Sequence, residues 1–126
     1  MADEEERFAE LVRYTAKAHV IVRMMLAELP IPVRVPEFPE PDADADDILP
    51  ALTALDRARA LISDEPLPLE LCSAYRNLIL EWLNAYEIVT LVQQAGPVSW
   101  RLDILTFTLH RIAVIVTMIE GGELLE

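Results

Sequence analysis

The proline-rich stretch between residues 30 and 47, PIPVRVPEFPEPDADADD, most restricts how this chain can fold, since it holds five of the nine prolines. Proline fixes φ and lacks a backbone N–H, so this stretch can be neither a helix interior nor a central strand. As extended chain it reaches roughly 50 Å, whereas a helix over residues 3–28 spans roughly 39 Å. The stretch therefore predicts a connection that crosses the full length of a helical bundle or passes to another subunit. The apolar members that predict its packing against the body are Ile31, Val33, Val35 and Phe38.

Helical periodicity governs the rest of the chain. The four predicted helices cover about residues 3–28, 47–63, 68–95 and 99–120, with the linker at 30–47. Pro30 ends the first helix, Gly96 the third and Gly121 the fourth. Because no β alternation is present and the last two connections are short, we predict a single all-α domain over residues 1–126. Its predicted form is an up-and-down four-helix bundle with a long proline-rich crossover between helices 1 and 2.

The predicted helix 99–120 is apolar around most of its circumference. A single bundle core needs an apolar face of somewhat over 100°, and this helix has about twice that. We therefore expect burial on two sides, the second side being supplied by another copy of the chain in a two-fold dimer. The alternatives are a monomer that covers this helix with its proline-rich linker, and a ligand or different protein in the same place. The narrow polar stripe consists of Asp103, Thr106, His110, Thr117 and Glu120.

The formal net charge of −12 is concentrated in two segments. Residues 3–6 and 37–47 hold ten of the 22 acidic residues, which leaves twelve to face the ten Lys and Arg. The folded body is therefore expected to be nearly neutral, and no nucleic-acid partner is expected. An acidic mimic that binds a basic protein is a further interpretation. It depends on the acids of the linker, Asp42, Asp44, Asp46 and Asp47.

Cys72 is the single cysteine, so no intrachain disulfide can form, and a reducing, cytoplasmic setting is expected. The acidic amino terminus does not resemble a signal peptide. A membrane-spanning helix needs roughly 18 consecutive apolar residues. Since charged residues interrupt every apolar run, we expect no membrane partner.

Motifs for catalysis and metal binding are missing from the sequence. It has no Glu-x-x-His pair, no His-Glu-x-x-His, no Gly-x-Ser-x-Gly and no glycine-rich phosphate loop. His19 and His110 are the two histidines, and each is expected to be a core or boundary residue that Thr15 or Asp103 satisfies. We therefore predict no catalytic residue, no metal ligand and no cofactor.

Seven residues are candidates for binding. Arg23 and Arg76 each lie next to an apolar helix face, where a guanidinium needs a carboxylate partner or an anionic ligand. The aromatic candidates are expected to act as packing or contact anchors. The full set is His19, Arg23, Arg76, Trp82, Trp100, Phe107 and His110.

The predicted function is that of a non-catalytic helical module for protein–protein interaction, a homodimer that also binds another protein, as small accessory, immunity, antitoxin or adaptor proteins do. This interpretation rests on the absent catalytic motifs and the surplus apolar surface. The alternative is a small-molecule-binding bundle or an enzyme. Its apolar pocket would lie between helices 1, 3 and 4. The expected polar contacts of that pocket are His19, Arg23, Arg76 and His110.

Overall fold

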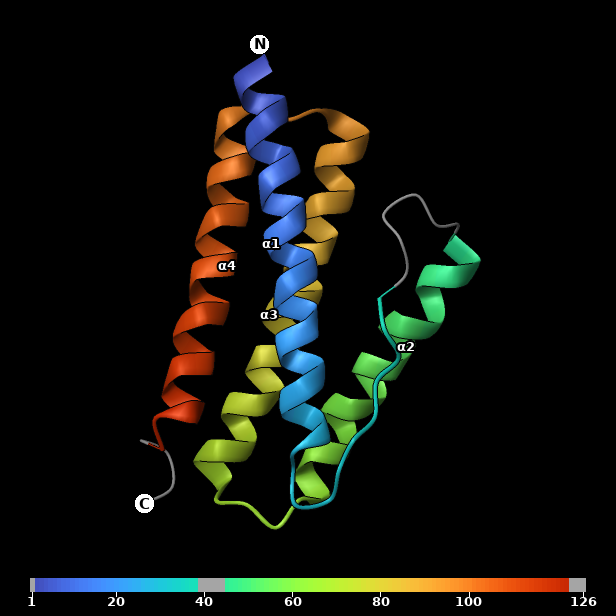
Figure 1. Cartoon of the computed structure of the whole chain (residues 1–126), viewed down its shortest axis with the longest axis vertical. Coiled ribbons are helices and arrows are strands. Elements are labelled where there is room, and N and C mark those ends of the chain that lie inside the picture. The colour runs from blue at the N-terminus through green and yellow to red at the C-terminus, as the bar shows by residue number, and fades with distance from the viewer. Residues whose placement is uncertain (1, 39–44, 123–126) are drawn as a thin grey trace.

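The computed structural model describes residues 2–38 and 45–122, and within these ranges it contains α-helices, one short 3-10 helix and no strand (Figure 1). The predicted all-α class is therefore confirmed, and the helix bounds differ from the predicted ones by at most two residues. The elements are α1 (Ala2–Ala27), α2 (Ala45–Leu61), the 3-10 helix η1 (Ile62–Asp64), α3 (Leu69–Ala95) and α4 (Ser99–Glu120).

Three long helices, α1, α3 and α4, lie side by side, with α3 running opposite to the other two (Figure 1). α2 packs against α3 and tilts away from the bundle toward its own amino-terminal end. Residues 39–44 lie outside the described residues. The predicted crossover falls partly on them, and the acidic-mimic interpretation depends on two of their acids.

Residues 28–38, which we call the strap, follow α1 and run back beside it toward α2 (Figure 1). Pro30 and Pro32 prevent a further helical turn, and the N–H of Val33 instead donates to the carbonyl of Leu26 at 2.9 Å. Val33 and Val35 are buried. The strap therefore packs against the body through Val33, Val35 and Phe38 as predicted, whereas Ile31, which was expected to do the same, is 55% exposed.

Trp82 lies at the centre of the core and is completely buried. Its Nε1–H donates to the backbone carbonyl of Thr15 at 2.9 Å, which joins α3 to α1. Its ring meets Tyr86 in a stacked contact and His19 and Phe38 edge to face. One side chain thus links α1, α3 and the strap. The other large, fully buried side chains include Leu26, Leu55, Ile62, Leu78, Ile79, Leu102 and Leu105.

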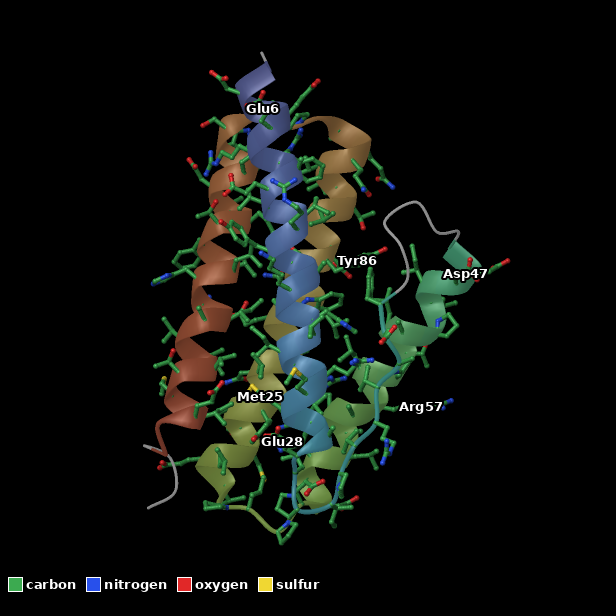
Figure 2. The ribbon with its side chains drawn as sticks, viewed as in Figure 1. Glu6, Met25, Glu28, Asp47, Arg57 and Tyr86 are labelled. Carbon is green, nitrogen blue, oxygen red and sulfur yellow. The ribbon has the colours of Figure 1, made fainter. Side chains whose placement is uncertain are left out.

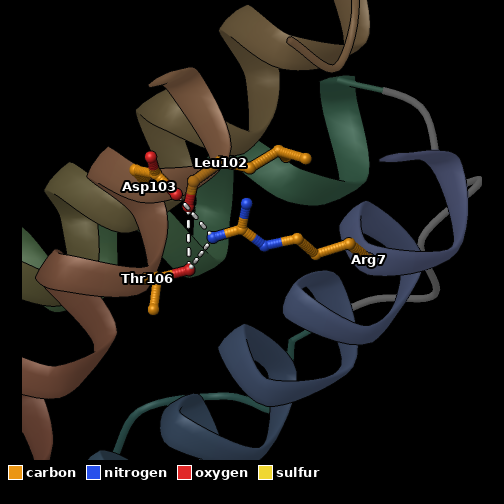
Figure 3. Close-up of polar contacts among 4 residues, drawn as sticks. All are labelled: Arg7, Leu102, Asp103 and Thr106. Carbon is orange, nitrogen blue, oxygen red and sulfur yellow. Dashed lines mark hydrogen bonds and ion pairs between the residues drawn. The ribbon is translucent and has the colours of Figure 1, made fainter. Parts of the chain in front are cut away.

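A polar contact at the surface connects the amino-terminal parts of α1 and α4 (Figure 3). The Arg7 Nη2 donates to Asp103 Oδ1 at 2.8 Å and to Thr106 Oγ1 at 3.0 Å. The Thr106 hydroxyl in turn donates to the carbonyl of Leu102 at 2.8 Å. Because these groups are exposed, the ion pair adds little stability, and its main effect is on the relative position of the two helices.

α4 is long and apolar enough to cross a membrane, judged by length and composition alone. Charged residues such as Arg111 do interrupt this helix, as predicted, but they are too few to exclude it by this criterion, and the expectation of no membrane partner stays a prediction. The core helix of a soluble protein can meet the same criterion, but only 22% of the most apolar window of α4 is buried. A large part of its apolar surface is consequently left outside the core of a single chain.

We predict that Trp82→Phe lowers the free energy of unfolding by about 2 to 4 kcal/mol, because it removes the hydrogen bond to Thr15 and leaves a void. Tyr14→Phe is the control. Tyr14 is 48% exposed, lies outside the exposed side of α4 and loses only a surface hydrogen bond to Glu10, so its replacement should change stability by no more than about 0.5 kcal/mol. Urea denaturation followed by far-UV circular dichroism, at one protein concentration, measures both values. Equal effects of the two substitutions would contradict the central role of Trp82.

Candidate functional site

A cavity of about 360 Å³ opens between α1, α3 and the strap. α1 lines it with residues three and four positions apart, which share one helix face. Tyr86 extends from α3 on the side that faces the strap and α2 (Figure 2). The lining residues are Val12, Thr15, Ala16, His19, Val20 and Arg23 of α1, Trp82, Tyr86, Val89 and Gln93 of α3, Glu37 and Phe38 of the strap, and Ile48 of α2.

His19 is the most deeply buried polar side chain of this cavity, at 1% exposure. Within residues 2–38 and 45–122 its Nε2 has no hydrogen-bond partner, and its ring centroid lies 4.9 Å from that of Trp82 and 5.3 Å from that of Phe38. Burial lowers the pKa of His19 to about 4, with a smaller contribution from the positive charge of Arg23. The imidazole is therefore neutral near pH 7. The expected partner, Thr15, donates its hydroxyl to the carbonyl of Leu11 instead.

Arg23 lies one helical turn from His19 and on the same side of α1, at the edge of the cavity. Its Nη1 is 3.5 Å from Oε1 of Glu37, longer than the roughly 2.7 to 2.9 Å of a strong charge-assisted hydrogen bond. The Glu37 side chain is 83% exposed. The carboxylate partner expected for Arg23 is thus present, but it is held loosely.

The structure brings together three of the predicted site residues, His19, Arg23 and Trp82, and places the others elsewhere. Arg76 donates to Ser63 Oγ at 3.1 Å and to Ser73 Oγ at 3.4 Å, at the start of α3. His110 is exposed beside the groove between α1 and α4. The four polar residues expected in one pocket between helices 1, 3 and 4 are therefore separated, since His19 and Arg23 line a cavity whose third wall is formed by the strap and α2. A hollow of about 420 Å³ does lie between α1, α3 and α4, around Tyr75 and Ile119, but none of the four lines it.

Phe38 and Tyr86 are cavity residues that the sequence analysis missed as site residues. Tyr86 lies one turn after Trp82 on α3, a spacing that places both rings on one helix face. Phe38 is the one aromatic residue in the proline-rich stretch. Both signals are visible in the sequence, but neither indicates that the strap folds back onto this part of α3.

The remaining two predicted anchors, Trp100 and Phe107, lie on the outer surface of α4. They belong to what we call the α3/α4 face. Arg111, within this face, forms an ion pair with the buried Glu81 of α3 and lies over the ring of Phe107, 5.7 Å from its centroid. The apolar members of the face are Trp100, Ile104, Phe107 and Val114 of α4 and Leu80 and Leu91 of α3, all exposed.

Among residues 2–38 and 45–122, no group of three or more His, Cys, Asp and Glu side chains is placed to hold a metal ion. Cys72 is buried, with its Sγ 3.6 Å from the carbonyl oxygen of Ile62. No protein-family model, curated protein or solved structure matches the chain.

We predict that His19 makes the fold less stable as the pH falls from about 6.5 toward 4. In this range the unfolded chain binds a proton at His19 that the folded chain does not, so the free energy of unfolding decreases with decreasing pH. His19→Leu removes this part of the pH dependence. His110→Leu, a change at the exposed histidine, serves as the control. Melting temperatures recorded across this pH range test the difference, and parallel curves for the wild type and His19→Leu would contradict it.

Proposed function

We propose that this protein is a non-catalytic helical interaction module that works as a homodimer joined through the α3/α4 face. The observation that carries the proposal is the exposed apolar stripe of α4. Phe107 is 59% exposed and Trp100 58% exposed, and Ile104 and Val114 extend the same stripe. Large apolar side chains that are contiguous on a surface are characteristic of association sites.

The strap does not cover this stripe in the part of the chain that the structure describes. Val33 and Val35 are buried beside α1 and α2, and Phe38 packs on Trp82, whereas α4 lies on the other side of the bundle (Figure 1). This position weighs against the alternative of a monomer that shields α4 with its linker. It supports a partner that comes from outside the chain.

The spacing of the stripe suits a second copy of the same chain. Its positions are 100, 104, 107, 111, 114 and 118, so the intervals of four and three residues read the same in both directions. Two α4 helices placed antiparallel across a two-fold axis would set Ile104 against Val114 of the partner subunit. Phe107 would then meet Arg111 of the partner subunit, adding a second cation–π contact to the one within each chain.

The small net charge of the α4 stripe is also compatible with the pairing of two copies. The α4 stripe carries one charged side chain, Arg111, and Glu81 neutralises it. Insertion into a membrane is a less favourable way to bury the exposed apolar side of α4. If α4 inserted, it would have to separate from α1 and α3 and expose Leu102, Leu105 and Ile112, each of which contributes about 1.5 to 3 kcal/mol by its burial.

We predict that the wild type is a dimer and that Phe107→Arg makes it a monomer, because the new charge would lie against Arg111 of the partner subunit. Leu49→Arg is the control, since Leu49 is exposed on α2, which packs against α3 and not against α4. Sedimentation equilibrium gives the subunit number of all three proteins. A monomeric wild type, or a wild type that binds neutral lipid vesicles through α4, would overturn the proposal.

The antiparallel register gives a separate prediction. The double variant Ile104→Cys with Val114→Cys should form a covalent dimer on mild oxidation, because these positions face one another across the axis. Ile104→Cys alone should remain uncrosslinked, since its two copies would lie far apart. Non-reducing gel electrophoresis distinguishes the outcomes. Efficient crosslinking of the single variant would show a parallel arrangement and would contradict this register.

A further inference from the structure

The cavity beside His19 has the dimensions and the lining of a small-molecule site. Its volume of about 360 Å³ falls within the roughly 300 to 1,000 Å³ typical of such sites. Apolar side chains form most of its wall, while His19 and Arg23 place two polar groups on one side, one turn apart on α1. A ligand for this cavity therefore needs an apolar body and a polar group at one end.

Arg23 determines the charge of that polar end. The Arg23 side chain is 31% exposed, and its 3.5 Å contact with the exposed Glu37 is weak enough for another anion to displace Glu37. Carboxylate and phosphate both match the geometry of a guanidinium, and the group already at Arg23 in this structure is a carboxylate. A cationic ligand would meet the like charge of Arg23, and the rings around His19 pack against one another at 4.9 to 5.8 Å rather than enclosing a cation.

The strap itself places an apolar ring and a carboxylate at the cavity. The ring of Phe38 lies 5.2 Å from Trp82 and 5.3 Å from Tyr86, and the carboxylate of the adjacent Glu37 faces Arg23. The chain thus places a phenyl ring and a carboxylate side by side at the edge of the remaining space. The same walls would accept these two groups on a separate molecule.

His19 is a second polar residue of the cavity wall. Its Nε2 has no hydrogen-bond partner among the described residues, and the surrounding protein closes this atom off from the open part of the cavity. A neutral imidazole can carry its proton on Nε2 and donate it to a carboxylate oxygen. A carboxylate would reach this atom only if the ring of Phe38, 5.3 Å from that of His19, moved aside, so Arg23 is the polar group that a ligand meets first.

From these contacts we propose that the cavity binds a small monocarboxylic acid with an aromatic or aliphatic body. Its carboxylate takes the place of Glu37 at Arg23, and its body lies in the apolar part of the cavity beside Tyr86. The site is separate from the α3/α4 face, so it does not depend on dimerisation. The bundle would then be a carboxylate-binding protein as well as an interaction module.

The test compares hydrocinnamate with its neutral amide, hydrocinnamamide, on the full chain. In a Trp100→Phe background the fluorescence of Trp82 reports binding, and calorimetry on the wild type provides a second readout. We expect hydrocinnamate to bind at least about tenfold more tightly than the amide, because a charge-assisted pair replaces a neutral hydrogen bond. Arg23→Gln should remove this preference, whereas the control Arg76→Gln, at a half-buried arginine outside the cavity, should retain it.

Glu37→Gln gives an independent check at an exposed position, where a folding defect is not expected. Since it removes the competing carboxylate, it should strengthen hydrocinnamate binding severalfold. Equal affinity for the acid and the amide, no saturable binding of either, or tighter binding of phenethylamine would each overturn the proposal. So would unchanged binding in an Arg23→Gln protein whose circular dichroism spectrum matches that of the wild type. Because dimerisation is measured separately, failure here would leave the proposed interaction function standing.

Discussion

The hydrogen bond from Trp82 to the backbone of Thr15 is the contact on which the arrangement of this bundle depends. It ties α3 to α1 at a point where the indole is completely buried, so the donor must have a partner and the two helices are fixed in register. The same ring forms the surface on which Phe38 of the strap packs. The Trp82 side chain thereby positions α1, α3 and the strap relative to one another.

The cavity follows from this arrangement. α2 is shorter than the other helices and packs against α3, so beside α1 the strap occupies space that a fourth long helix would fill in a regular bundle (Figure 1). An extended segment contributes fewer side chains per unit length than a helix does, and the space beside Phe38 stays open. His19 and Arg23 border that space because both lie on the α1 face that also contacts Trp82. Burial of this kind keeps the imidazole neutral and leaves Arg23 as the positive group of the site.

α4 is only partly covered by the rest of the chain. One side of it supplies Leu102, Leu105 and Ile112 to the core, and the other presents Trp100 and Phe107 to solvent. The ion pair between Arg111 and Glu81 removes the net charge from the middle of that exposed side. The cavity and the exposed stripe thus lie on different sides of the three long helices, and occupation of one does not require occupation of the other.

The helices, their approximate ends and the apolar excess of α4 could be predicted from the sequence, because these depend on local spacing and on the backbone properties of proline and glycine. His19, Arg23 and Trp82 were also among the residues that the sequence indicated. That these three residues meet, that Phe38 and Tyr86 join them, and that Arg76 and His110 do not, follows from the packing of the helices and the strap. In the sequence Arg23 and Arg76 are equivalent, since each interrupts an apolar face. They differ in the folded chain because the strap packs beside Arg23 and not beside Arg76. This packing depends on contacts between residues more than forty positions apart, such as Phe38 and Trp82, and local periodicity does not predict such contacts.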